Sequence, residues 1–272
     1  MKKNKIILSV GITLITVSAA FLLFPAISNL INSIFNNSTI SNYSESVKTL
    51  SKDVVESEFS TASEYNRKLC ESVSISYSTK AYVEGYDKIL NFNEIIGYIE
   101  IPKIDVKLPI YHGSNESVLT KGAAHLPNSS FPIGGASNHT VLTAHTGYPT
   151  QVFFDNLTEL ESGDLIFINV LDRQLTYSVV EQNIVEPEDI SHLQIDEKKD
   201  LISLVTCYPY GINSHRLIVT AERYISSANE IVPAEVDNDS CAYIAIALFS
   251  VLLLAVLIFT VIKLRKGREP NA

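Results

Sequence analysis

The stretch L-V-T-C-Y-P-Y-G-I-N-S-H-R-L-I-V-T, from Leu204 to Thr220, joins two apolar runs through a short loop. The runs, Leu201–Thr206 and Leu217–Arg223, are predicted to be β-strands, because the loop between them contains Pro, Gly and Asn, which favour turns. If the strands pair as an antiparallel hairpin, Cys207 and Arg216 lie at the same end. A guanidinium near a thiol stabilises the thiolate, so this arrangement favours a reactive cysteine.

His145 has a similar setting, because it follows the apolar run Thr140–Ala144 and precedes a Gly-Tyr-Pro turn. His139 begins the same run, and six residues of extended chain put the two rings roughly 20 Å apart, so only one can reach Cys207. A histidine beside a thiol and a cation is the set of groups that cysteine acyl transfer needs. The residues alone also allow Cys207 to be a buried small side chain and His145 an ordinary surface residue.

The central part of the chain has the pattern of a mainly β domain. Short apolar runs separated by Gly, Pro and Asn predict an all-β barrel or sandwich. Beyond the runs already named, the expected strands are Ile95–Ile101, Leu108–Tyr111, Leu165–Val170 and Gln174–Glu181. Asp155–Leu160 and Pro187–Leu193 are expected to be short helical crossovers.

Three different segments precede this domain. Asn32–Ser46 is rich in Asn, Ser and Thr and is predicted to be a linker. Apolar positions at helical spacing run from Val47 to Leu69, with one lapse at Glu58, and predict an amphipathic helix that packs on the domain. Cys70–Gly85 has no clear period and is expected to cross the surface as a loop.

Both ends of the chain carry apolar segments long enough to span a bilayer, Ile6–Ile31 and Cys241–Ile262. Lysines and arginines flank the outer end of each segment, so the positive-inside rule predicts a two-pass protein with both termini in the cytoplasm. The region between them would be extracellular. Ile6–Ile31 can also be interpreted as a cleaved signal peptide with small residues at Ser18–Ala20, although apolar residues continue beyond that site.

The charge and the cysteines narrow the possible functions. The formal charge is −9, and without the seven basic residues and one acidic residue at the two ends it is −15, from 14 basic and 29 acidic residues. No basic cluster remains, so nucleic-acid binding is not expected. The histidines lack zinc-ligand spacing, and neither a metal nor an organic cofactor is predicted. The sequence also allows a disulfide between Cys70 and Cys207.

Three motifs stand out: G-Y-I-E-I-P-K-I-D-V-K-L-P-I-Y-H-G at 97–113, T-A-H-T-G-Y-P around His145, and T-C-Y-P-Y-G-I-N-S-H-R-L around Cys207 and Arg216. Together they resemble the sortase family, and more narrowly its class C, the pilus-assembling sortases of Gram-positive bacteria. The similarity runs from about Tyr65 to Arg223. A membrane segment on each side of the domain also fits class C.

The resemblance implies an eight-stranded sortase-type β-barrel with short helices and a cysteine transpeptidase activity. Cys207 would be the nucleophile that attacks an LPxTG-like sorting signal between Thr and Gly. His145 would be the general acid and base, and Arg216 would position the substrate and stabilise the oxyanion. The partners implied are pilin or surface-protein substrates with such a signal, a lysine amine of the next pilin subunit as acceptor, and the cell membrane.

The expected domains follow from these readings. They are a membrane anchor at 1–31, a linker, helix and lid region at 32–91, the catalytic barrel at 92–225, a linker at 226–240, a transmembrane helix at 241–262 and a basic cytoplasmic tail at 263–272. Class C sortases commonly carry an Asp-Pro-aromatic lid motif, which Cys70–Gly85 lacks. Either other residues anchor a lid there, such as Tyr77 or Tyr82, or the site is more open.

Two other functions remain as alternatives. The first is a sortase that attaches surface proteins to peptidoglycan, with a cross-bridge amine as acceptor. The second is a membrane-tethered β-barrel that binds wall proteins without catalysis. Conversion of an LPxTG peptide separates the second from the enzymes, and the identity of the amine acceptor separates the two enzymes.

Overall fold

The structure is a computed structural model of the 272-residue chain, and it describes residues 2–71 and 85–225. Four of the expected segments lie wholly or mostly outside these residues. They are most of the loop Cys70–Gly85, the linker at 226–240, the transmembrane helix at 241–262 and the tail at 263–272.

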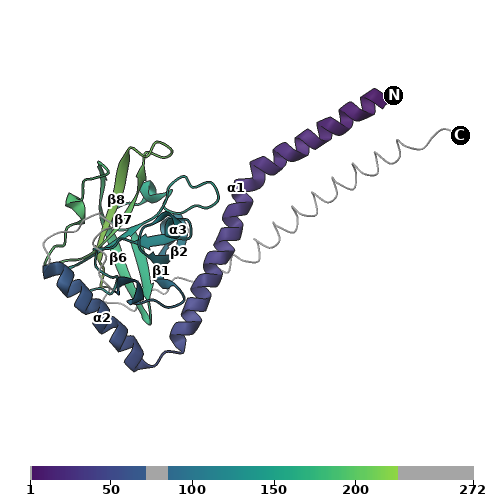
Figure 1. The fold of residues 1–272 in the computed structure, drawn as a ribbon. Helices are drawn as coiled ribbons and strands as arrows, with labels where there is room; N and C mark the ends of the chain where they lie inside the picture. Colours follow the sequence, from purple (N-terminus) through teal and green to yellow (C-terminus); the bar gives the residue numbers. More distant parts are fainter. Residues whose placement is uncertain (1, 72–84, 226–272) are drawn as a thin grey trace. The chain divides into compact units, whose positions relative to one another are not determined.

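Eight strands close into a barrel, which confirms the fold that the resemblance implied (Figure 1). Around the barrel their order is β1-β2-β3-β4-β7-β8-β6-β5. The strands are β1 (Ile95–Ile101), β2 (Val106–His112), β3 (Ala123–His125), β4 (Asn138–Thr143), β5 (Leu165–Val170), β6 (Arg173–Val185), β7 (Asp200–Tyr208) and β8 (His215–Arg223). Short helices connect some of them: η2 (Pro102–Ile104), α3 (Glu116–Leu119), η3 (Leu157–Glu159) and η4 (Ser191–Leu193). A further short helix, η1 (Tyr86–Lys88), precedes β1.

The neighbouring strands β4, β7 and β8 are covered on both faces, which makes them a firm support. Side chains on one face join the main core of the barrel: Leu142, Leu204 and Val219. On the other face, Val141, Val205 and Ile218 of these strands form a second cluster, the outer cluster, together with Leu126, Val185 of β6 and Leu193 of η4. Because both faces are apolar, these strands read as continuous apolar runs in the sequence.

β3 is the strand that the apolar pattern did not predict. It has only three residues, and it pairs in parallel with β2 and antiparallel with β4. Gly122 precedes it because a Cβ there would lie 2.5 Å from the backbone oxygen of Pro109. The pairing of β3 therefore depends on closure of the barrel and on the close approach of two backbones. Neither produces a recognisable apolar pattern in a sequence of three residues.

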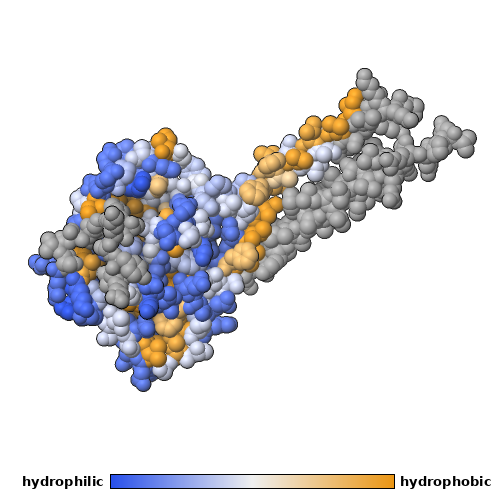
Figure 2. Space-filling model, in the orientation of Figure 1, coloured by the Kyte–Doolittle hydropathy of each residue, from blue (hydrophilic) through white to orange (hydrophobic). Residues whose placement is uncertain are grey.

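The long helix α1 (Lys2–Lys48) begins with an apolar part that agrees with the predicted membrane anchor. By length and composition, the helix contains a candidate membrane span within Thr13–Lys48. Large apolar side chains there face outward, among them Phe21 at 77% and Leu22 at 82% exposure. Figure 2 shows this part of α1 as a largely apolar surface, while polar residues dominate the surface of the barrel.

α1 also corrects the linker predicted at Asn32–Ser46, because these residues continue the helix. Asn, Ser and Thr cost only about 0.7 kcal/mol or less per residue in a helix relative to Ala, so packing can override their preference. Ile40, Tyr43 and Val47 supply that packing, and all three are buried. The Tyr43 hydroxyl donates to the backbone oxygen of Ile96 at 2.9 Å.

α2 (Lys52–Glu71) confirms the amphipathic helix but not its start, because Val47 belongs to α1. Its buried face holds Val55, Phe59, Ala62, Tyr65 and Asn66. The polar lapse at Glu58 has a role in packing, since its carboxylate accepts a hydrogen bond from the backbone N–H of Leu90 at 2.9 Å. Arg173 of β6 stacks on Phe59 at 3.7 Å from the ring centroid.

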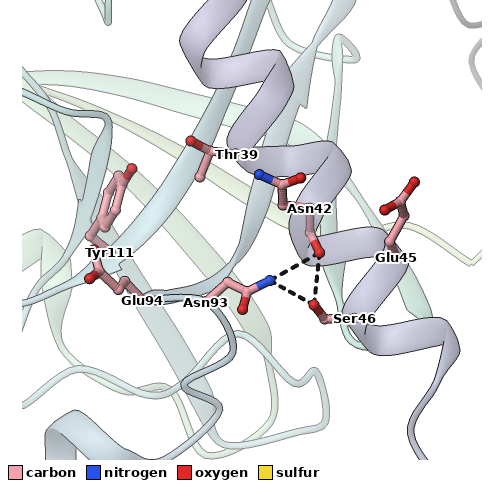
Figure 3. A pocket seen from close by; sticks show the side chains of 7 residues that line it. All are labelled: Thr39, Asn42, Glu45, Ser46, Asn93, Glu94 and Tyr111. Atoms are coloured by element: carbon pink, nitrogen blue, oxygen red, sulfur yellow. Dashed lines mark hydrogen bonds between the residues drawn. The ribbon is translucent and has the colours of Figure 1, made fainter.

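A polar cavity of about 490 Å³ lies where the end of α1 meets β1 and β2 (Figure 3). It is lined by Thr39, Asn42, Glu45, Ser46, Asn93, Glu94 and Tyr111. The Asn93 amide donates to the Asn42 backbone oxygen at 3.0 Å and to the Ser46 hydroxyl at 2.7 Å. Asn93 thereby fastens the barrel to the helix, which is a structural role.

Candidate active site

Cys207 lies near the end of β7, directly opposite Arg216 of β8. The antiparallel register pairs the two residues, as the hairpin reading of the sequence predicted. Cys207 is partly exposed, and both it and Cys70 are free thiols, so the structure contains no disulfide between them. The Arg216 guanidinium donates through Nη1 to the backbone oxygens of His215 at 3.0 Å and Asn213 at 3.3 Å.

His145 follows β4, which pairs in parallel with β7 on the side of β7 away from β8. The register joins Thr143 to Val205, and it continues beyond the strand, because Ala144 N–H donates to the Val205 oxygen at 3.2 Å. The Thr206 hydroxyl donates back to the Ala144 oxygen at 2.9 Å. His145 comes two residues after Thr143, and Cys207 comes two residues after Val205. The two residues are therefore at the same level on neighbouring segments of the barrel.

Alternation along the strands puts Cys207 and Arg216 on the same face as the outer cluster. Cys207 comes two residues after Val205, and Arg216 comes two residues before Ile218, both members of that cluster. Side chains two residues apart in a strand share a face. The thiol and the guanidinium thus lie beyond the outer cluster on the same face of the sheet. The strands that carry them, β7 and β8, are packed on both faces.

Aromatic rings hold the His145 imidazole in place. The ring stacks on Tyr148 with centroids 5.2 Å apart and planes 10° apart, and Phe153 meets it at 62°. Its Nε2 atom is enclosed, and no described residue forms an aligned hydrogen bond with it. The Glu116 carboxylate of α3 lies 3.3 Å from Nε2, close enough for an ion pair when the ring is protonated.

The loop after His145 is also fixed by polar contacts. The Asp155 carboxylate accepts hydrogen bonds from the backbone N–H groups of Gly147 and Phe153, both at 2.9 Å. Gly147 has a positive φ of 72°, and a Cβ there would lie 3.2 Å from the Tyr210 ring of the β7–β8 loop. Glycine is therefore needed at this position, both for its backbone angle and for the approach of Tyr210.

Four residues around the site were not singled out from the sequence: Glu116, Tyr148, Asp155 and Tyr210. Tyr148 and Asp155 follow His145 closely along the chain, so the turn after the strand could have pointed to them. Glu116 lies 29 positions before His145 and follows no strand directly, and only the folded barrel brings the two together.

Three other histidines, His125, His139 and His215, have contacts away from Cys207. Burial lowers the pKa of His125 to about 3. Its Nε2 faces the Ser130 carbonyl at 2.9 Å and must carry the proton, so Nδ1 accepts from the Tyr86 hydroxyl at 2.7 Å. Burial also lowers the pKa of His139, which bonds the Gln194 oxygen. His215 directly precedes Arg216 on β8, and its Nε2 lies 3.4 Å from the Glu186 carboxylate.

The described part of the chain, residues 2–71 and 85–225, contains no group of three or more His, Cys, Asp or Glu side chains that could hold a metal ion. What the Cys207 edge does contain is a thiol with a cation on one side and an imidazole on the other. Such a set can form a covalent acyl intermediate, stabilise an oxyanion and move protons.

Comparison with known proteins places this geometry in a family. The sortase domain matches residues 99–224, from β1 to the end of β8. Sortase D of Bacillus subtilis is 33% identical over 115 residues, which are 42% of this chain and 55% of that protein. The chain therefore spans little more than half the length of that relative.

Solved structures give longer matches. Sortase C of Streptococcus pneumoniae is 37% identical with a TM-score of 0.65, and the match covers 71% of this chain and all of that one. The pilus-related sortase C of Group B Streptococcus is also 37% identical, with a TM-score of 0.63, over 68% of this chain and 96% of that one. This chain belongs to the sortase family, and its structural neighbours are class C sortases.

Proposed function

We propose that this chain is a membrane-bound cysteine transpeptidase that polymerises pilin. It would cleave an LPxTG-like sorting signal between Thr and Gly and join the acyl group to a lysine amine of another pilin subunit. The observation that carries the proposal is that Arg216, Cys207 and His145 lie on or directly after three adjacent strands, β8, β7 and β4, at the same end of the barrel. The pilus-related names of the structural neighbours support pilin as the substrate.

The first half-reaction would use all three groups. The Cys207 thiolate attacks the Thr carbonyl carbon, and the resulting oxyanion is stabilised by the Arg216 guanidinium. The C–N bond to Gly then breaks, and protonated His145 gives its proton to the leaving amine. The product is a thioacyl-enzyme in which the Cys207 sulfur holds the Thr carbonyl.

The second half-reaction would reverse the proton movement. Neutral His145 accepts a proton from the incoming amine, and the amine attacks the thioester carbonyl. The C–N bond forms and the C–S bond breaks, which frees Cys207. The three roles are distinct, but the first half-reaction needs all of them, so each substitution should reduce formation of the thioacyl-enzyme.

Intact mass spectrometry of the full-length protein in detergent tests the proposal. With an LPxTG-type peptide, the wild-type protein should gain the mass of the acylated fragment. Cys207→Ala should gain none, while His145→Ala and Arg216→Ala should gain it much more slowly. If wild type gains no adduct with any signal variant, the transpeptidase proposal fails and the non-catalytic binding alternative is favoured.

The acceptor decides between the two enzyme alternatives. Adding either a peptide with a pilin-type lysine or a peptidoglycan cross-bridge peptide to the thioacyl-enzyme shows which amine is joined. Faster transfer to lysine supports pilin polymerisation. Faster transfer to the cross-bridge amine would instead make the protein an anchoring sortase, with the same chemistry at Cys207.

The proposal includes an extracellular barrel with both termini in the cytoplasm. Cys70 is exposed on α2, so it can report the side of the membrane. On intact cells, a membrane-impermeant thiol reagent should label the Cys207→Ala variant, and the label should drop when Cys70 is also replaced by Ser. Labelling of Cys70 only after lysis would reverse the proposed orientation.

A further inference from the structure

Four groups lie in order along the edge of the barrel that contains Cys207. Arg216 belongs to β8, Cys207 to β7 and His145 to the end of β4, and the barrel order places these strands side by side. The next strand is β3, and α3 with Glu116 leads into it. A cation therefore lies on one side of the thiol, and a carboxylate lies on the other side beyond the imidazole.

Glu116 combines proximity to His145 with openness to solvent. Its Oε1 is 3.3 Å from His145 Nε2, and its side chain is 73% exposed. A carboxylate can accept about four hydrogen bonds, and among the described residues this one has no ion-pair partner besides His145. An exposed carboxylate with free capacity, next to an enclosed ring nitrogen that lacks a hydrogen-bond partner, is accessible to a donor that arrives from solution.

The second half-reaction presents the site with such a donor. A lysine amine has an ordinary pKa near 10.4, so it approaches as an ammonium and must lose a proton before it can attack. We propose that Glu116 binds the ammonium group of the acceptor lysine and holds it against His145. This inference rests on the proposed transpeptidase function and deepens it, because it names the group that recognises the acceptor.

The chemistry balances with the groups on this edge. The bound ammonium gives one proton to neutral His145, and the resulting amine attacks the thioester carbonyl carbon. As the C–N bond forms and the C–S bond breaks, a second proton leaves the nitrogen and ends on the Cys207 sulfur. The amide keeps the third, so the products are an isopeptide, a protonated His145 and a free thiol. Glu116 remains ionised throughout.

The rim of the barrel offers a matched control. Glu186 lies 3.4 Å from Nε2 of His215, and its side chain is 72% exposed. The distance and exposure are close to those of Glu116, but His215 is paired with Tyr208 and not with Cys207. Glu186→Gln therefore removes an equivalent charge from the same rim without touching the proposed acceptor site.

The test compares two nucleophiles on full-length protein in detergent that carries the thioacyl group from an LPxTG-type peptide. One is Nα-acetyl-lysine amide, which is a cation, and the other is hydroxylamine, which is neutral at neutral pH. Glu116→Gln should lower the ratio of lysine transfer to hydroxylamine transfer by about threefold to tenfold, as expected for losing one charged contact near the surface. Glu186→Gln should keep the wild-type ratio. Added salt should lower the wild-type ratio toward that of Glu116→Gln, because it screens exposed charges.

Two outcomes would overturn the inference while the proposed function stands. If both transfer rates are the same in Glu116→Gln and wild type, Glu116 does not select the ammonium. If transfer to both nucleophiles falls equally, Glu116 only positions His145. Failure of the proposed function is recognised separately, because the wild-type protein would then form no thioacyl-enzyme at all.

Discussion

The rim of the barrel carries two histidine–glutamate pairs that look alike in isolation. His145 lies 3.3 Å from Glu116, and His215 lies 3.4 Å from Glu186. The two carboxylates are 73% and 72% exposed. Both histidines are also close in sequence or register to Cys207 and Arg216, so the pairs alone do not tell which one takes part in chemistry.

Strand register and enclosure separate them. His145 is level with Cys207, and its ring packs against Tyr148 and Phe153. His215 precedes Arg216 by one residue, so its side chain points to the opposite face of β8. Its Nδ1 bonds the Ser214 hydroxyl at 2.8 Å, and its side chain is 41% exposed against 24% for His145. A histidine beside a carboxylate is therefore not by itself a sign of catalysis. The position of the histidine in the sheet, relative to Cys207, decides whether it can take part.

The largest expected difference between the pairs is in catalysis. His145→Ala should slow formation of the thioacyl-enzyme by about 10²- to 10⁴-fold, because general acid–base catalysis typically contributes that much. His215→Ala should change the rate by less than about twofold. Both rates are measured by incubating each variant with an LPxTG-type peptide, quenching the reaction with acid at successive times and determining the mass of the intact protein by mass spectrometry. Comparable losses in the two variants would show that register does not distinguish them.

An intermediate effect contrasts the rim histidines with the buried His125. Burial lowers the pKa of His125 to about 3, while an unfolded histidine titrates near 6.5. Below about pH 6.5 the unfolded chain binds a proton that the folded chain does not. The free energy of unfolding should therefore fall as pH falls from 6.5 toward 3, by ~1.4 kcal/mol per pH unit for this group. Above pH 6.5 His125 is neutral in both states, so this loss of stability is absent there.

Urea unfolding between pH 7 and pH 5 measures this slope. His125→Gln removes the group that titrates and should make the slope shallower, whatever it does to stability at pH 7. The groups that face His125 are Tyr86, Ser129, Ser130 and, through its charge, His112. An unchanged slope in the variant would mean that His125 does not control acid sensitivity.

The smallest effect sharpens the comparison of the two carboxylates. Because both are exposed, Glu116→Gln and Glu186→Gln should each shift the melting temperature by less than about 3 °C, as surface ion pairs contribute little. Thermal unfolding followed by circular dichroism measures both shifts. A large loss in Glu116→Gln alone would indicate a structural role and would remove the basis for comparing their effects on acceptor transfer.

Most of the barrel could be predicted from apolar runs and turn residues. The seven expected strands all exist, with ends shifted by a few residues, because buried strands leave a local signature of apolar residues between Gly, Pro and Asn. The exceptions depend on contacts far along the chain. β3 is too short to leave a pattern, and Asn32–Ser46 is helical because Tyr43 and its neighbours pack on the barrel.

The candidate site shows the same division. Cys207 and Arg216 were expected at one end of a hairpin because the loop between their strands is short, and the register pairs them. His145 was singled out because it follows a strand, but the sequence could not show that β4 pairs with β7. The partners of the imidazole, above all Glu116, come from a different connection of the barrel and have no local signal.

The sequence by itself determined the apolar strands and the apolar N-terminal helix, because each is encoded by neighbours a few positions away, and its resemblance to sortases pointed to the three residues proposed for catalysis. Only the tertiary structure decided which strands are adjacent, which histidine stands level with the thiol, and which of two exposed carboxylates lies beside it. The physical reason is that barrel closure joins segments through backbone hydrogen bonds, which every residue except proline can both donate and accept. Side chains specify the strands, and the register of the closed sheet specifies the site.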